Sequence, residues 1–162
     1  MNPEIVKRQE DLQRLIGEVR RLKNSGQVGE PIVSQFVWYL CVRTSGYIEY
    51  SVGTILLEFY ETRNEHPPLS DFVIKQLKLS REFPMRRVRD IVNSFRENRP
   101  DSREEFDYSK LDATLESIQK NRNQIAHGGE AYSLSMSDLD TYFATAEEVI
   151  NMVYEECNPS GS

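Results

Sequence analysis

Hydrophobic residues recur at helical spacing along most of the chain. Between residues 3 and 24 they fall three or four positions apart among charged side chains, which predicts an amphipathic helix ending at Asn24-Ser25-Gly26. From Pro31 to about Arg63, an apolar-rich stretch without a further proline predicts a long central helix. Because this helix is apolar on two sides, we expect one side to face another subunit. Its main stripe is Val37, Cys41, Thr44, Ile48, Val52, Ile55 and Phe59, and its second edge is Phe36, Leu40 and Tyr47.

Four shorter helices are expected in the second half of the chain. After a proline-rich break, the pattern predicts helices over residues 70–79 and 85–95, followed by a polar loop. A helix resumes at Ser109 and runs to a stop at Gly128-Gly129. The last helix starts near Ser137 and has Leu139, Phe143, Ala146, Ile150 and Val153 in register.

These elements predict an all-α fold, a bundle of about five to six helices, because no strand pattern and no repeat is present in the sequence. We expect residues 1–157 to form a single domain, in which an N-terminal helix (1–24) joins a core bundle (31–157). Residues 158–162 are expected to form a disordered tail.

Composition places the chain among globular proteins. Its 162 residues are 38% hydrophobic and 28% charged, with no apolar run near the roughly 20 residues that cross a bilayer. No secretory signal follows Met1, so the expected location is the cytoplasm. Cys41 and Cys157 lack the spacing of a disulfide framework or a metal site, and we expect neither metal nor cofactor.

The net charge of −6 argues against tight binding to nucleic acid by charge alone. The charge is uneven, however, because residues 75–103 are rich in Lys and Arg while the chain after 103 is acidic. These arginines are either weak candidates for RNA contacts or simply solvated helix faces. The candidates are Arg86, Arg87, Arg89, Arg96, Arg99 and Arg103.

One charged residue interrupts the apolar stripe of the helix that starts at Ser109. Arg122 stands where Leu111, Leu115, Ile118 and Ile125 predict another apolar residue. A buried guanidinium is costly unless it is paired or lines a wet cleft. Arg122 is therefore either an ion-pair partner for an acid of a neighbouring helix or part of a site.

Two polar residues flank Arg122 on the same helix. Asn123 and His127 are four positions apart, so their side chains project side by side. His127 precedes the Gly stop, where the negative end of the helix dipole favours an imidazolium. His127 is thus either a proton donor or acceptor, or a simple charge match at the helix end.

The segment Lys120-Asn-Arg-Asn-Gln-Ile-Ala-His-Gly128 resembles the R-polar-x-x-x-H signature of the HEPN superfamily. Arg122, Asn123 and His127 match its three positions. Residues 43–51, Arg-Thr-Ser-Gly-Tyr-Ile-Glu-Tyr-Ser, are similar to the corresponding segment of standalone HEPN proteins of prokaryotic defence and toxin systems. The resemblance covers residues from about 31 to 157.

The resemblance implies a metal-independent endoribonuclease, a toxin or anti-phage effector, that is a homodimer or a larger homo-oligomer. Its cleft would form where two signature helices meet across a two-fold axis, and a nearby gene would encode an inhibitor or sensor. The chemistry of these side chains is compatible with RNA cleavage. Arg122 would clamp a phosphate oxygen, and His127 would act as general base or acid. Asn123 would orient His127 or the phosphate. RNA supplies its own nucleophile, the 2′-hydroxyl.

Two residues of the long helix are secondary candidates. Glu49 shares a helical face with Trp38 and Ser45, and is either a partner of Arg122 in the cleft or a solvated surface acid. Arg43 interrupts the second apolar edge, where it would contact a phosphate or form a salt bridge across a dimer.

Two rival functions remain open. The chain could be a non-catalytic HEPN module that binds a nucleotide or a partner such as a nucleotidyltransferase-like protein, which also suits a net-acidic chain. It could also be a helical interaction domain without a site. In that case Arg122→Leu would stabilise the fold by removing an unneeded charge.

Overall fold

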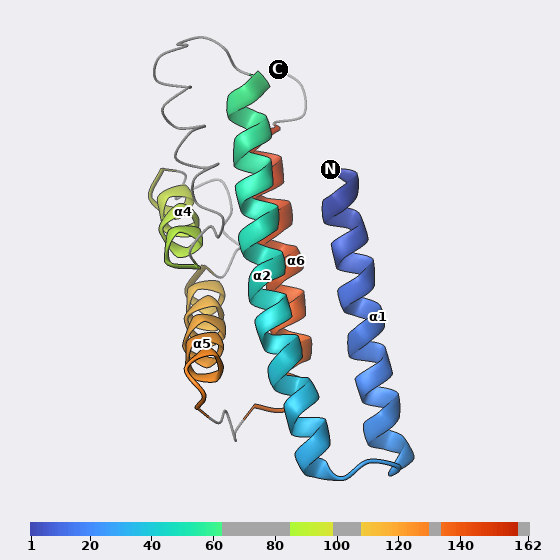
Figure 1. Cartoon of the computed structure of the whole chain (residues 1–162). Coiled ribbons are helices and arrows are strands. Elements are labelled where there is room, and N and C mark those ends of the chain that lie inside the picture. The colour runs from blue at the N-terminus through green and yellow to red at the C-terminus, as the bar shows by residue number, and fades with distance from the viewer. Residues whose placement is uncertain (63–84, 99–107, 130–133, 159–162) are drawn as a thin grey trace.

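The fold is all-helical in the residues that the structure, a computed structural model, describes: 1–62, 85–98, 108–129 and 134–158. They contain helices and no strand (Figure 1). The helices are α1 (Pro3–Ser25), α2 (Glu30–Thr62), α4 (Met85–Asn98), α5 (Tyr108–Ala126) and α6 (Met136–Cys157).

Local sequence signals set both ends of α1. The Asn2 side chain accepts a hydrogen bond from the Glu4 backbone N–H at 2.8 Å, and Pro3 occupies the first turn, where a missing N–H costs nothing. At the other end Gly26 adopts a left-handed conformation with φ of 66°. Residues with a side chain rarely adopt this angle, so Gly26 stops the helix and lets the chain turn into α2.

The helices form four columns, with α2 in the middle (Figure 1). α2 packs against α1, α5 and α6, and also against α4. The fourth column is split, because α4 and α5 contact each other and follow one another along the same side of α2. This arrangement buries a long length of α2 and leaves the last turns of α5 at the edge of the bundle.

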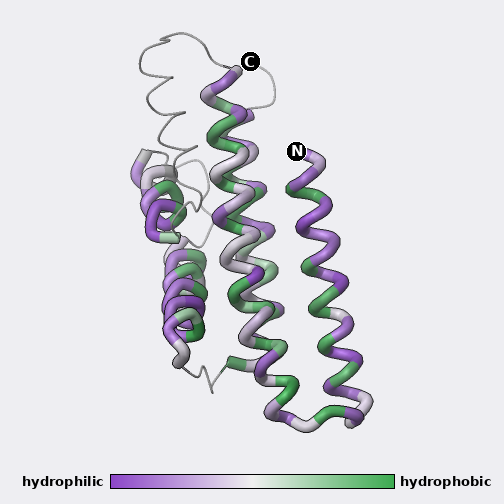
Figure 2. The backbone as a smooth tube through the Cα atoms, in the orientation of Figure 1, coloured by the Kyte–Doolittle hydropathy of each residue, from purple (hydrophilic) through white to green (hydrophobic). Residues whose placement is uncertain are grey.

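The core follows the predicted main stripe of α2. All of its members are buried except Phe59, which is half-buried. On the second edge Leu40 and Tyr47 are buried, but Phe36 is 39% exposed. Figure 2 shows hydrophobic residues along the whole of α2, whereas hydrophilic residues dominate α1. The contact of α2 with another subunit stays a prediction.

Polar contacts hold α1 against α6. The Gln9 amide donates to Glu147 at 2.6 Å, and Arg20 forms an ion pair with Asp140. At the far end the Met1 amine donates to the Tyr154 hydroxyl at 3.0 Å. Because these contacts are spread along both helices, α1 is fixed over its whole length.

The predicted helices that fall on described residues agree with the observed ones to within a few residues, α4 ending at Asn98 where residue 95 was expected. α6 begins at Met136, and its cap is Ser135 where the sequence indicated a start near Ser137. Tyr142 is buried at 5% exposure, and Phe143, expected in register with the core, is half-buried and packs against it. The predicted helix over residues 70–79 lies outside the described residues, and no helix among those described is long and apolar enough to span a membrane.

Candidate functional site

The apolar packing of α5 stops before its C-terminal turns. Leu111, Leu115 and Ile118 are at most 3% exposed, so the first two-thirds of the helix is anchored in the core. Farther along, Ile125 is only half-buried. The turns that carry the predicted site residues therefore depart from the core and are open to solvent.

Arg122 lies half-buried in these turns, with Asn123 exposed beside it. The guanidinium of Arg122 donates to the side-chain oxygen of Asn123 at 3.2 Å. The burial of Arg122 is therefore intermediate between that of an arginine in a core ion pair and that of a fully solvated arginine. A half-buried guanidinium can meet a phosphate oxygen while retaining a hydrogen bond to the protein.

Two glycines end α5 directly after the site residues. Gly128 has φ of 77°, and its N–H donates to the Ile125 carbonyl at 3.0 Å. The Gly129 N–H donates to the Gln124 carbonyl at 2.8 Å, which completes a Schellman motif. A Cβ on Gly129 would lie 2.9 Å from that carbonyl oxygen. Both glycines favour this stop, so α5 ends at Ala126 and His127 directly follows the helix with its side chain exposed.

The sequence at this helix end is locally basic. Residues 119–129 include Lys120, Arg122 and His127 and contain no acidic residue, although the chain as a whole is acidic. The helix terminus itself carries partial negative charge, which stabilises cationic side chains placed there. A cationic segment of this kind suits the phosphodiester backbone of RNA.

A polar network joins this end of α5 to α6. The Tyr142 hydroxyl lies 2.6 Å from Ser117 Oγ, and the Asn121 amide donates to the same hydroxyl at 2.7 Å. Burial raises the pKa of Tyr142, so the phenol stays protonated at neutral pH. The sequence analysis missed this network. Its signal was Tyr142 itself, three residues after the buried Leu139, where helical period places a core residue.

Glu49 and Arg43 occupy different surroundings on α2. Glu49 is 7% exposed and accepts a hydrogen bond from Ser45 Oγ at 3.2 Å, so the expectation of a solvated surface acid is wrong. Its pairing with Arg122 stays a prediction. Arg43 is exposed and donates to the Tyr39 hydroxyl at 3.0 Å. It borders, with Arg8, a groove of about 310 Å³ between α1 and α2.

The weaker basic candidates divide into three groups. Arg86 and Arg87 are exposed on α4. Arg89 is already bound by a residue of the same chain, because its guanidinium donates to both oxygens of Asp112 at 2.8 and 3.3 Å. This hydrogen bonding raises the pKa of Arg89, and a phosphate would have to compete with Asp112 for it. The Arg96 side chain, Arg99 and Arg103 lie outside the described residues.

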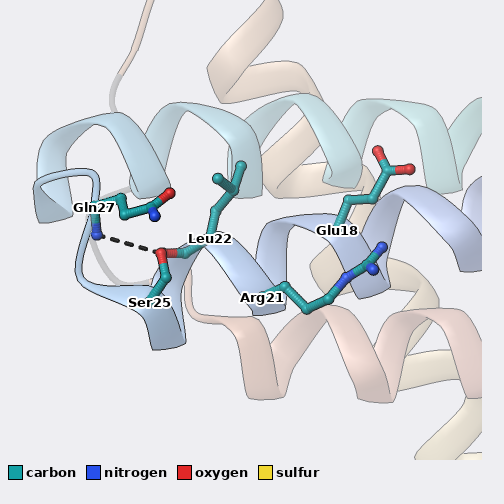
Figure 3. A pocket seen from close by; sticks show the side chains of 5 residues that line it. All are labelled: Glu18, Arg21, Leu22, Ser25 and Gln27. Carbon is teal, nitrogen blue, oxygen red and sulfur yellow. Dashed lines mark hydrogen bonds between the residues drawn. The ribbon is translucent and has the colours of Figure 1, made fainter.

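A pocket away from the site residues lies at the end of α1 (Figure 3). Its volume is about 440 Å³, and it is lined by Glu18, Arg21, Leu22, Ser25 and Gln27. One acid and one base in its lining give it no preference for an anion. It includes none of the predicted site residues, and over the described ranges no group of three His, Cys, Asp or Glu side chains could share a metal ion.

Comparison with known proteins gives one match. The family model described as RiboL-PSP-HEPN matches residues 4–158, which include every helix of the bundle and the segment with Arg122, Asn123 and His127. No curated protein and no solved structure matches the chain. Because the match extends over nearly the whole length, the chain belongs to the RiboL-PSP-HEPN family, within the HEPN superfamily.

Proposed function

We propose that this protein is a metal-independent endoribonuclease of the HEPN type that acts as a homodimer in the cytoplasm. Its role would be that of a toxin or an anti-phage defence effector, restrained by an inhibitor or activated by a sensor. The supporting observation is the end of α5, where Arg122, Asn123 and His127 lie within two turns and reach solvent. Family membership supports a HEPN module, and the ribonuclease activity is our inference from these residues.

The chemistry needs few protein groups. The RNA 2′-oxygen attacks the adjacent phosphorus and loses its proton to a general base, while the bond from phosphorus to the 5′-oxygen breaks and that oxygen gains a proton. Arg122 would stabilise the charge that develops on the phosphoryl oxygens, and His127 would transfer one of the two protons. The products would be a 2′,3′-cyclic phosphate and a 5′-hydroxyl.

Two proton transfers explain why we propose a dimer. One protomer offers one histidine in this segment, whereas the reaction needs both a base and an acid. A two-fold axis next to the ends of two α5 helices would bring two copies of His127 to one phosphodiester. Asn123, which already accepts from Arg122, would keep that guanidinium oriented.

The test is cleavage of total RNA in the presence of EDTA. We expect the wild type to cut and Arg122→Ala and His127→Ala to be inactive at matched folding. Lys110→Ala is the matched control, because it removes an exposed cation from the first turn of the same helix, away from the signature. A substrate with 2′-deoxy sugars should resist the wild type, since it lacks the nucleophile.

Two outcomes would overturn the proposal. Intact RNA with the wild type as well as the variants would favour the non-catalytic module that binds a nucleotide or a partner protein. Equal cleavage by the wild type and His127→Ala would remove His127 from the reaction. In cells we expect growth arrest on expression, and His127→Ala should abolish it.

A further inference from the structure

The last turns of α5 have little apolar anchoring, although they carry the residues of the proposed reaction. Ile118 is the last fully buried residue of the helix, and Arg122 and Ile125 beyond it are half-buried. Catalytic groups need supporting contacts, because small errors in their direction cost rate. Ile125 packs against the core there, and a polar contact adds to fixing the rotation of these turns.

The Tyr142 hydroxyl supplies that contact. It meets Ser117 and Asn121, which are one turn apart on the same side of α5, at 2.6 and 2.7 Å. Two hydrogen bonds from one fixed oxygen to residues one turn apart define the rotation of the helix about its axis. Asn121 directly precedes Arg122, so its rotation also determines where the guanidinium points.

Tyr142 is itself held rigidly. Its side chain is 5% exposed on α6, and its neighbours Leu139 and Ala146 on that helix are completely buried. α6 also begins with a capping box, in which Ser135 Oγ and the Asp138 backbone N–H are joined at 3.2 Å. The hydroxyl thus projects from a buried position on α6 toward the half-buried end of α5.

We propose that Tyr142 is a positioning residue, whose hydroxyl sets the direction of Arg122, Asn123 and His127 through Ser117 and Asn121. The inference rests on the proposed ribonuclease function for its effect on rate. The anchoring of α5 by Tyr142 can be measured without any substrate. Tyr142 remains distinct from a catalytic residue, because its hydroxyl is occupied by two contacts within the protein.

The test compares Tyr142→Phe with Tyr154→Phe, which removes a hydroxyl from the same helix at a contact with the Met1 amine. In hydrogen exchange of the folded proteins, Tyr142→Phe should speed exchange of the amides of residues 119–127. In RNA cleavage its kcat should fall about tenfold with a smaller change in KM, as for an interaction that matters mainly in the transition state. Tyr154→Phe should change neither quantity.

A double-mutant cycle separates this role from general destabilisation. Tyr142 and Asn121 act as a unit if their effects are not additive. The double variant Tyr142→Phe, Asn121→Ala should then have the same kcat as Tyr142→Phe alone. Unchanged exchange over residues 119–127, or unchanged kcat with faster exchange, would overturn the inference. Intact RNA with the wild type would contradict the ribonuclease proposal, while the exchange comparison would still support or overturn the anchoring by Tyr142.

Discussion

Single residues decide where the proposed chemistry can take place. Gly128 adopts a conformation that a side chain disfavours, and Gly129 leaves no room for a Cβ, so the helix ends at Ala126, one residue before His127. Arg122 lies one turn after Ile118, the last fully buried residue of α5. The predicted site residues are thus positioned by the apolar residues that precede them on α5 and by the two glycines that follow them.

The glycine after the site can be tested against a glycine elsewhere. Gly129→Ala should destabilise the protein by roughly 1–3 kcal/mol, because the new Cβ would clash with the Gln124 carbonyl and break the Schellman motif. Gly17→Ala, inside α1 with no atom near its Cβ position, should stabilise it by about 0.5–1 kcal/mol. Urea unfolding measures both, and equal effects of the two changes would contradict the explanation.

Burial of the Cys41 thiol predicts weaker folding at high pH. Burial raises the pKa of Cys41 from its ordinary value of 9.0 to about 12. The unfolded chain then loses this proton first, so the free energy of unfolding is unaffected below pH 9 and decreases between pH 9 and about 12. In urea unfolding Cys41→Ala should make this decrease shallower. A slope identical to the wild type would show that Cys41 does not contribute.

At the scale of elements, apolar periodicity was sufficient to predict most of the bundle. α1 and α2 were predicted nearly to their ends, because proline, asparagine and glycine mark those ends in the sequence. The start of α6, expected near Ser137, lies one residue earlier at Met136, where the hydrogen bonds between Ser135 and Asp138 form the cap. The Tyr142 network was missed because a pattern shows which face is buried, and not which hydroxyl meets which amide.

The cap of α6 provides a prediction at this scale. Ser135→Ala should lower stability by about 1 kcal/mol, since it removes the side chain that accepts from the Asp138 N–H. Ser137→Ala is the matched control, because Ser137 is exposed one position past the helix start. Thermal unfolding of the two variants should differ accordingly. A loss confined to Ser137→Ala would contradict the assignment of Ser135 as the cap.

At the scale of the whole molecule, the reaction that we propose would need a second protomer to complete the site. The bundle presents one Arg122 and one His127 at an exposed helix end, and α2 leaves Ile32, Phe36 and Tyr39 between 39% and 49% exposed. Exposed apolar side chains at helical spacing are common where proteins associate. The activity we propose should therefore depend on assembly.

Dependence on assembly can be measured with an inactive copy of the chain. An excess of the double variant Arg122→Ala, His127→Ala should inhibit the wild type, because exchange of subunits leaves most wild-type protomers beside an inactive partner. Dilution should likewise reduce the activity per protomer. Undiminished activity in both experiments would indicate that one protomer carries a complete site.

The contacts of the chain ends have a practical consequence. Met1 binds Tyr154 near the end of α6, and Asn2 binds Glu58 near the end of α2, so both ends of the described chain gather at one pole of the bundle. In Figure 1 the end of α5 points toward the opposite pole. An affinity tag or a fluorescent protein joined at the N-terminus would emerge at the pole opposite to the end of α5. Labelled and immobilised versions of this protein should therefore behave in RNA assays as the untagged chain does.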